Sequence, residues 1–301
     1  MSRAATWITL LLAGVTVATA LYMNFLGMNK DIHPDPQATN SKEQTFSTAQ
    51  SPIVPPSKLD KGSFVRTIRG DTRSMTEKTL ARWQEWRQAV ELLSMQNPDT
   101  LFIGGPSEKK ALCLTFDDGP DNRNTPKVLD ILQKEQVRAT FFFLGNNSEQ
   151  YRKIVKQTYD AGHVIGSHSF DHPYLTKKTE PQLTEQVHKT EQSMFEIIGK
   201  RPTLLRPPYG DINASVLNVL NKNGYKAVLW SLDTFDWNQK TSTEIVDYVS
   251  SNVHPGDIIL MHSADNGSAS VKALPAIIAA LKHAGYSFCT VDEMLGITPY
   301  H

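Results

Sequence analysis

The sequence predicts an α/β fold, a barrel of about seven parallel strands in which each strand is joined to the next by a helix. The first observation is a regular alternation, from Lys109 onward, of short apolar segments with amphipathic segments, which is typical of βα units. The second is length, because about seven such units occupy fewer than about 200 residues, which favours a barrel, complete or incomplete, over an open sheet. The predicted strands are 111–116, 139–144, 163–168, 203–206, 226–232, 257–262 and 287–291, and the helices between them include 126–133, 182–198 and 271–283.

Residues 1–28 have the pattern of a targeting segment. Arg3 precedes an apolar stretch that runs to about Met28, longer than the roughly 7–15 apolar residues of a cleaved signal peptide and sufficient to span a bilayer. The Ala-Thr-Ala sequence at 18–20 would serve as a cleavage site, but residues 21–26 continue the apolar run. We therefore favour an uncleaved anchor over a signal peptide cleaved near Ala20. Either one places the rest of the chain outside the cytoplasm.

Two segments separate this N-terminus from the predicted barrel. Residues 29–73 are polar and rich in Pro, Ser, Thr and Gln, which predicts a flexible tether. Ser74 and Glu77 have the spacing of a capping box, and apolar residues follow at helical spacing. We expect residues 74–108 to contain a helix that packs on the domain formed by 109–296.

Composition excludes some classes of function. Lys and Arg together number 31, Asp and Glu also number 31, and the pI is about 7.1, whereas nucleic-acid-binding proteins usually carry a basic excess. We expect a monomer that contacts the membrane only through its N-terminal segment. Cys113 and Cys289 are the only cysteines, and each lies in a predicted strand. They are either a disulfide between the first and last strands of the barrel or two small buried core residues.

Chemically active residues follow the carboxyl ends of the predicted strands, which is where (β/α) barrels place their active sites. Asp117 and Asp118 follow the first strand, His168 closes the third and His172 lies in the loop beyond it. The later strands are followed by Arg206, Asp233, Asp236, Trp237 and His262. Two imidazoles and a carboxylate suit a divalent metal and leave coordination positions open. The second aspartate is then free to act as a general base, so the pattern predicts a metallohydrolase.

Five motifs carry a resemblance to a known family. They are Thr-Phe-Asp-Asp-Gly-Pro (115–120), His-Ser-Phe-Asp-His (168–172), Arg-Pro-Pro-Tyr-Gly (206–210), Asp-Thr-Phe-Asp-Trp (233–237) and Leu-Met-His (260–262). In this order they resemble the motifs of the polysaccharide deacetylases, carbohydrate esterase family 4, over residues 109–295. The resemblance implies a distorted (β/α) barrel and metal-dependent removal of N- or O-acetyl groups from sugar polymers.

The resemblance also implies a metal centre and a base. Asp118, His168 and His172 match the family's metal ligands, usually for zinc, with another divalent metal such as Co²⁺ as the alternative. Asp117 matches the base that takes a proton from the attacking water. Arg206 matches the residue that positions this base.

The other implied roles concern the leaving group and the acetyl pocket. His262 matches the general acid that protonates the leaving amine, and Asp236 matches the carboxylate that raises the pKa of that histidine. Trp237 and Leu260 match the apolar walls around the acetyl methyl group. The backbone N–H of Tyr209 matches an oxyanion donor.

We expect the substrate to be an N-acetylated cell-wall glycan, because an anchor with a long tether suits an enzyme that faces the wall. Peptidoglycan N-acetylglucosamine is the first choice, and N-acetylmuramic acid, chitin oligomers and acetylated xylan stay open. Two other classes are weighed against this one. A non-haem Fe(II) oxygenase shares the two-His, one-carboxylate set but needs no second aspartate and no acid histidine. A non-catalytic glycan-binding module would release no acetate.

Overall fold

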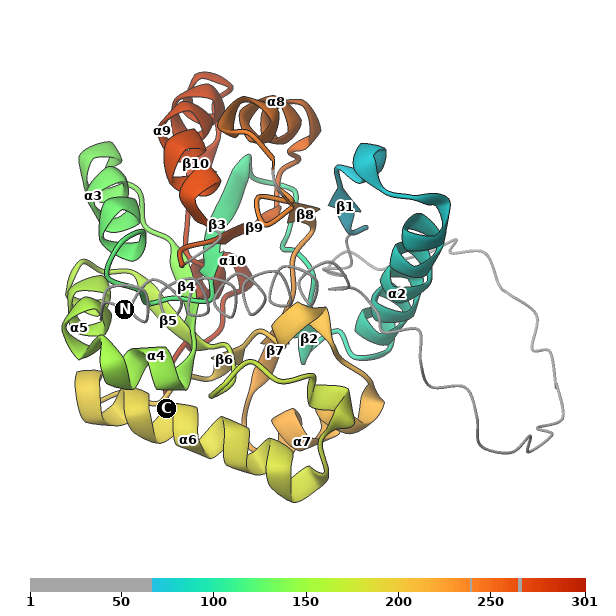
Figure 1. Ribbon diagram of the computed structural model, residues 1–301, viewed down its shortest axis with the longest axis vertical. Helices are drawn as coiled ribbons and strands as arrows, with labels where there is room; N and C mark the ends of the chain where they lie inside the picture. The colour runs from blue at the N-terminus through green and yellow to red at the C-terminus, as the bar shows by residue number, and fades with distance from the viewer. Residues whose placement is uncertain (1–66, 239, 265–266) are drawn as a thin grey trace, which may run out of the picture. The chain divides into compact units, whose positions relative to one another are not determined.

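The computed structural model describes residues 67–238, 240–264 and 267–301 (Figure 1). The predicted targeting segment (1–28) and nearly all of the predicted tether (29–73) lie outside these described residues. Within the described ranges, none of the helices combines the length and the apolar character needed to cross a membrane. Residues 76–86 form a unit separate from the α/β unit, which comprises residues 67–75 and the described residues from Arg87 onward.

The α/β unit is built on one curled sheet in which every strand pairing is parallel (Figure 1). The strand order is β1-β8-β9-β3-β4-β5-β6-β7-β2, with β10 beside the start of β3, so the barrel is open and ends in two edge strands. The strands are β1 Arg69–Gly70, β2 Leu101–Phe102, β3 Ala111–Asp117, β4 Thr140–Phe143, β5 Val164–Ser167, β6 Leu204–Leu205, β7 Lys226–Val228, β8 Leu232–Asp233, β9 Ile258–His262 and β10 Ser287–Phe288.

The predicted number of strands is corrected from about seven to ten among the described residues. Six of the predicted strands have one counterpart each, but the segment predicted as 226–232 forms two strands, β7 and β8. The carbonyl groups of Val228 and Leu229 accept hydrogen bonds from the Arg206 side chain, and the chain leaves the sheet there. This segment crosses from one end of the sheet to the other, so it spans the gap in the barrel. β1 and β2 have two residues each, too few to show a periodic pattern.

Helices surround the sheet of the α/β unit (Figure 1). A continuous apolar core joins β3, β4 and β9 to α3 and α9, and it includes Phe116 and Phe141, whose rings stack at 5.1 Å. Phe141, Phe142 and Phe143 are all fully buried, so β4 is covered on both faces. The helices are α2 Glu77–Gln96, α3 Thr125–Glu135, α4 Gly145–Gln150, α5 Arg152–Asp160, α6 Glu180–Ile198, α7 Ala214–Lys222, α8 Ser242–Asn252, α9 Ser268–His283 and α10 Val291–Leu295.

The helix predicted within residues 74–108 is α2, but its predicted cap is wrong. The hydroxyl of Thr76, not that of Ser74, accepts the N–H of Thr79 at 3.2 Å, so Thr76 is the N-cap residue. The second half of α2 packs within the α/β unit, where Val90 is buried and the hydroxyl of Ser94 donates to the carbonyl of Leu101.

Candidate active site

The parallel register brings the predicted site residues to one edge of the sheet. Asp117 at the end of β3 lies in register with His262 at the end of β9, and Ser167 at the end of β5 pairs with Leu205. The residues that directly follow these strand ends, including Asp118 and His168, therefore lie at the carboxyl edge of the barrel.

Asp118, His168 and His172 form a group that fits a metal ion. Their ligand atoms all lie within 4.8 Å of one another, and Asp118 Oδ1 lies 3.4 Å from His168 Nε2 and 3.3 Å from His172 Nε2. Metal–ligand bonds of about 2.1 Å at tetrahedral angles would separate the ligand atoms by about 3.4 Å. Asp118 Oδ1 is buried without a hydrogen-bond partner, since both imidazole contacts are long for a bond to a carboxylate. This orphaned oxygen and this donor set fit a divalent cation.

Neighbouring groups set the tautomer of His168 and the ionisation of Asp118. His168 Nδ1 donates to the carbonyl of Arg206 at 2.7 Å, so the lone pair of Nε2 faces Asp118. Burial disfavours the charged form of Asp118, but the close imidazoles of His168 and His172 and the charge of His262 outweigh it and hold its pKa well below the usual range. Asp118 is therefore ionised, as a metal ligand must be.

Unusual backbone conformations aim several of these residues. Asp118 (φ 69), Ser169 (φ 68), His172 (φ 64) and Tyr209 (φ 60) all have positive φ, a region that non-glycine residues rarely adopt. Local hydrogen bonds hold two of them, because His172 N–H donates to Ser169 Oγ at 3.1 Å and the Asn147 side chain donates to the carbonyl of Asp118 at 2.9 Å. Such strain clusters at functional sites, where the surrounding structure enforces it.

Asp117 is buried beside the metal group and is held by Arg206. Arg206 is fully buried, and its NH1 donates to Asp117 Oδ1 and to Thr115 Oγ1, both at 2.8 Å. The guanidinium also donates to two main-chain carbonyls and lies 4.2 Å from the ring centre of Phe142. Asp117 Oδ1 is thus occupied, while Oδ2 lies 3.8 Å from His168 Nε2. Arg206 therefore holds the Asp117 carboxylate next to the group formed by Asp118, His168 and His172.

His262 and Asp236 form a second ion pair, and His262 lies beside Asp117 in the register of β9 with β3. His262 Nδ1 donates to Asp236 Oδ1 at 2.7 Å, and His262 Nε2 lies 4.0 Å from Asp118 Oδ2. Burial alone would lower the pKa of His262, but the negative charge of Asp236, with those of Asp118 and Asp117, raises it to about 10. At neutral pH the imidazole is therefore cationic and can donate a proton.

The predicted pocket residues Tyr209, Leu260 and Trp237 have different surroundings. The Tyr209 ring meets the edge of His172 at 4.4 Å and stacks on Tyr174 at 4.3 Å, so it borders the metal group. Leu260 is buried on the same face of β9 as His262, two residues earlier. Trp237 follows Asp236 and packs against Phe235 at 5.1 Å.

Sequence reasoning missed Ser270, which holds the acid pair. Ser270, buried in the first turn of α9, donates to Asp236 Oδ2, which also accepts the backbone N–H of His262 at 2.8 Å. Asp233 Oδ1 accepts the N–H of Phe235 at 2.8 Å and so shapes the turn that carries Asp236. Burial raises the pKa of Asp233 to about 7. The sequence offered one signal for Ser270, because a helix begins a few residues after His262. The sequence does not show that Ser270 contacts Asp236, because this contact depends on how the loop folds.

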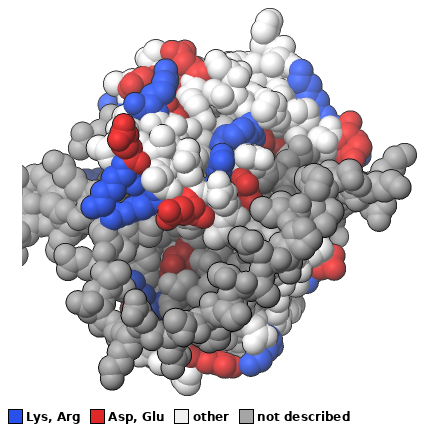
Figure 2. Space-filling model, turned by 90° about the vertical axis from the view of Figure 1, so that its right-hand side faces the viewer, with Lys and Arg blue, Asp and Glu red and all other residues white. Residues whose placement is uncertain are grey.

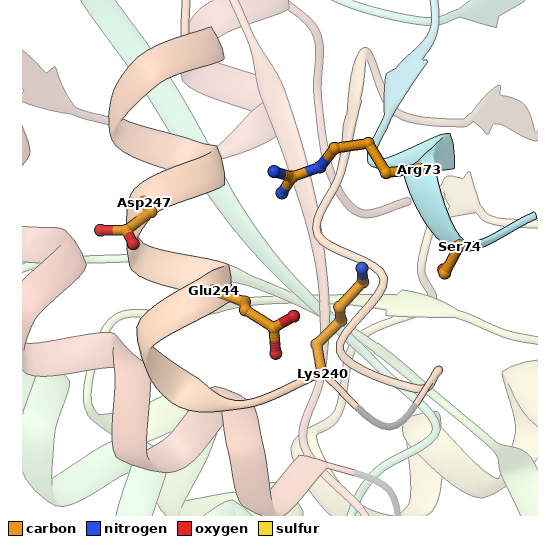
Figure 3. Close-up of a pocket in the computed structure, with 5 residues that line it drawn as sticks. All are labelled: Arg73, Ser74, Lys240, Glu244 and Asp247. Atoms are coloured by element: carbon orange, nitrogen blue, oxygen red, sulfur yellow. The ribbon is translucent and has the colours of Figure 1, made fainter.

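A separate hollow of about 380 Å³ is lined by Arg73, Ser74, Lys240, Glu244 and Asp247, none of which is a predicted site residue (Figure 3). Its two cations bind buried Asp71, with Arg73 Nε at 2.7 Å and Lys240 Nζ at 3.0 Å. These contacts hold the pKa of Asp71 well below the usual range. On the face in Figure 2, acidic and basic side chains alternate over the described residues. This face therefore shows no basic patch of the kind that binds nucleic acid.

Comparison with known proteins agrees with the site geometry. The family model for polysaccharide deacetylases matches residues 104–228. A peptidoglycan-N-acetylglucosamine deacetylase of Bacillus cereus is 43% identical over 194 residues, covering 64% of this chain and 70% of that protein. The peptidoglycan-N-acetylmuramic acid deacetylase PdaA of Bacillus subtilis is 38% identical over 201 residues, covering 65% of this chain and 75% of that protein.

The fold has solved counterparts as well. The crystal structure of a peptidoglycan N-acetylglucosamine deacetylase in complex with a benzamide compound matches with a TM-score of 0.67 and 38% identity, over 69% of this chain and 98% of that one. The resemblance inferred from the five motifs is thereby confirmed. The chain belongs to the polysaccharide deacetylase family of carbohydrate esterase family 4, and it is an amide hydrolase that acts on N-acetyl groups.

Proposed function

We propose that this protein is a zinc-dependent N-deacetylase of bacterial cell-wall glycan and that its first substrate is the N-acetylglucosamine of peptidoglycan. One observation carries the proposal: the Asp117–Arg206 pair and the His262–Asp236 pair both border the group formed by Asp118, His168 and His172. A base and an acid thus both lie next to the place where an acetamide would react. The identity of the sugar is supported by the Bacillus cereus relative, which is a peptidoglycan-N-acetylglucosamine deacetylase.

Asp118, His168 and His172 would hold the metal, because they supply one carboxylate and two imidazole nitrogens around the orphaned oxygen. When bound, a divalent cation would polarise the acetyl carbonyl and make the attacking water more acidic. Two nitrogen ligands and one oxygen ligand suit zinc, and Co²⁺ accepts a similar set.

Asp117 acts as the general base in this proposal. Its Oδ1 is committed to Arg206 at 2.8 Å, which leaves Oδ2 to accept a proton from the attacking water. Arg206 takes no proton itself and acts as a positioning residue, because it is fully buried and its donors are divided among Asp117, Thr115 and two carbonyls.

His262 acts as the general acid. An amine leaves well only when it is protonated, and the cationic imidazole supplies that proton to the nitrogen as the C–N bond breaks. The products are acetate and a free amino group on the sugar. Asp236 keeps His262 cationic and fixes its ring at 2.7 Å.

The remaining predicted residues would shape the acetyl pocket. Trp237 and Leu260 would enclose the methyl group, which explains apolar residues next to a polar centre. The backbone N–H of Tyr209 would donate to the developing oxyanion. The Tyr209 ring is kept in place by Tyr174 and His172.

We also propose that the enzyme works outside the cytoplasm as a monomer, tethered by residues 29–73 to a membrane anchor at 1–28. The apolar length of that segment and the polar composition after it support this proposal. Cell fractionation, followed by N-terminal sequencing of the mature protein, separates an anchor from a signal peptide cleaved near Ala20.

Acetate release from a substrate panel tests the proposed function. The panel contains peptidoglycan, N-acetylmuramic acid-containing fragments, chitin oligomers and acetylated xylan, and mass spectrometry locates each lost acetyl group. We expect a loss of about 42 Da, the mass of one ketene unit, per N-acetylglucosamine, with the Asp117→Asn variant as the inactive control. Binding without acetate release would mean a glycan-binding module. Turnover restricted to N-acetylmuramic acid would reassign the substrate to the class of the Bacillus subtilis relative.

A further inference from the structure

Three sulfur atoms meet at the end of the barrel opposite the active site. Cys113 lies near the start of β3, Cys289 directly follows β10, and Met294 lies on α10. The register of β10 with β3 pairs Phe288 with Leu112, and the N–H of Cys289 donates to the carbonyl of Leu112 at 3.1 Å, so the two cysteines lie side by side on parallel chains. We call these three residues the sulfur cluster.

Two sulfur–sulfur distances in the cluster match the spacing of ligands around one ion. Cys113 Sγ lies 3.8 Å from Cys289 Sγ and 3.7 Å from Met294 Sδ, and both cysteines are free thiols. With metal–sulfur bonds of about 2.3 Å, ligand atoms lie about 3.8 Å apart at tetrahedral angles and about 4.0 Å apart in a trigonal plane. Both distances from Cys113 therefore fit a shared metal without rearrangement of the strands.

The surrounding chain makes room for the thioether at this point. A Cβ atom on Gly105 would lie 2.3 Å from Met294 Cγ and 2.4 Å from its Sδ, so only glycine leaves Met294 in this place. Cys113 is fully buried, whereas Cys289 and Met294 are partly exposed. The cluster thus has one enclosed ligand and an open side through which an ion can enter.

We propose that the sulfur cluster is a binding site for a soft monovalent cation, namely Cu(I). Thiolate and thioether ligands select soft ions such as Cu(I), whereas hard ions such as Mg²⁺ and Ca²⁺ prefer oxygen ligands. Binding is a ligand exchange without electron transfer: each thiol loses its proton to solvent, and two thiolates and one thioether bind the ion.

This site is separate from the proposed zinc centre. Cys113 and Asp117 are four positions apart on β3, a separation of about 13 Å along a strand. The two sites also differ in ligand type, because the active-site group offers only nitrogen and oxygen. The inference does not depend on the proposed substrate, so either can fail without the other.

Titration of the full chain with Cu(I) tests the site. The zinc-loaded, reduced enzyme is freed of reductant under argon, which keeps the active-site imidazoles occupied, and Cu(I) is added in competition with a chromophoric Cu(I) chelator. We expect one tightly held equivalent, with X-ray absorption showing sulfur ligands at about 2.3 Å. Loss of an outer-shell partner already weakens metal binding about 10–100-fold, so Met294→Leu should weaken it at least about tenfold. The double variant Cys113→Ser/Cys289→Ser should retain no Cu(I).

Matched controls keep the test decisive. Met194→Leu replaces a buried methionine outside the cluster and should bind Cu(I) like the wild type. Acetate release and circular dichroism show whether each variant is folded, and Met294→Leu keeps both thiols if the serine variants do not fold. The proposal is overturned if the wild type holds no more Cu(I) than the double variant, or if Met294→Leu binds as tightly as the wild type. Isolation of the chain with Cys113 and Cys289 joined in a disulfide would also overturn it and would make the pair a covalent staple.

Discussion

Replacement of Asp236 by Asn tests how the protein keeps His262 cationic. The pKa of His262 is raised from 6.5 to about 10, against the effect of burial, chiefly by the charge of Asp236 and its 2.7 Å hydrogen bond, and secondarily by Asp118 and Asp117. At about 1.4 kcal/mol per unit, the whole shift corresponds to roughly 5 kcal/mol in favour of the imidazolium. The asparagine side chain of Asp236→Asn would keep an acceptor but lose the charge, while the burial that lowers the pKa of His262 remains.

The sign of the expected change follows from this balance. His262 is an acid that must hold its proton, so the rate is sustained below its pKa and falls as pH rises through it. A cation at Asp118 would cancel part of the neighbouring negative charge, so the alkaline limb of the metal-loaded enzyme should lie somewhat below about 10. Because Asp236 is the largest favourable contribution, the limb of Asp236→Asn should move down by at least about 1.5 units. The rate at pH 9 should then fall at least about fourfold relative to the plateau of the same variant.

The assay is kcat for acetate release between pH 5 and pH 10.5 at saturating substrate, with metal content checked at each pH. Asp233→Asn is the matched control, because Asp233 is also buried and close but accepts a hydrogen bond from Phe235 instead of His262. It should move the limb by less than about 0.5 unit. An alkaline limb that stays in place in Asp236→Asn would show that another group titrates there and that His262 is not the acid.

The remaining predictions concern the metal, the base and Asp233. Asp117→Asn should keep its metal and lose at least about 10²-fold in kcat, whereas Asp118→Asn should lose both the metal and the activity. Elemental analysis and acetate release measured on each variant distinguish the two outcomes. Near-full turnover of Asp117→Asn would refute the assignment of Asp117 as the base. His168→Ala or His172→Ala should weaken zinc binding strongly, because each removes one of three protein ligands, and calorimetry measures the loss. Chelation should abolish turnover and Zn²⁺ should restore it, so full activity of a verified metal-free enzyme contradicts the mechanism. Burial raises the pKa of Asp233 to about 7, so the folded state favours the protonated carboxyl group. The contribution of this protonated group to the free energy of unfolding is intact below about pH 4 and is lost as pH rises through about 7. Asp233→Asn should therefore raise the melting temperature more at pH 8.5 than at pH 4.5, with a ceiling of about 4 kcal/mol, and equal melting shifts at both pH values would contradict the raised pKa.

Local patterns were sufficient for the elements that carry the site. β3, β4 and β9 are largely buried, mainly apolar runs, so their existence followed from composition, and polar residues marked their carboxyl ends. The Asp-Asp-Gly-Pro-Asp sequence is local as well: Asp121 Oδ1 accepts the N–H groups of Asn124 and Thr125 and so begins α3 directly after the metal-site aspartate.

Patterns failed where a distant partner decides the structure. The apolar run 226–232 has the pattern of one strand, but Arg206 binds the carbonyls of Val228 and Leu229 and divides it into β7 and β8. Ser74 has the spacing of a cap, yet Thr76 caps α2, because capping depends on backbone geometry that spacing does not encode. Strands of two residues, such as β1 and β2, carry no periodic signal at all.

The sequence by itself determined the chemistry of this protein: which residue types are present, in which order, and at which strand ends. Tertiary structure alone decided their working states. The pKa of His262 depends on Asp236 from another strand end, and the ligand geometry of Asp118 depends on loops in left-handed conformations. The contact between Cys113 and Cys289, 176 positions apart, arises only because β10 lies beside β3. Electrostatic and metal-binding properties depend on distances of a few ångströms. Those distances are established only when the strands pair in register and the sheet curls.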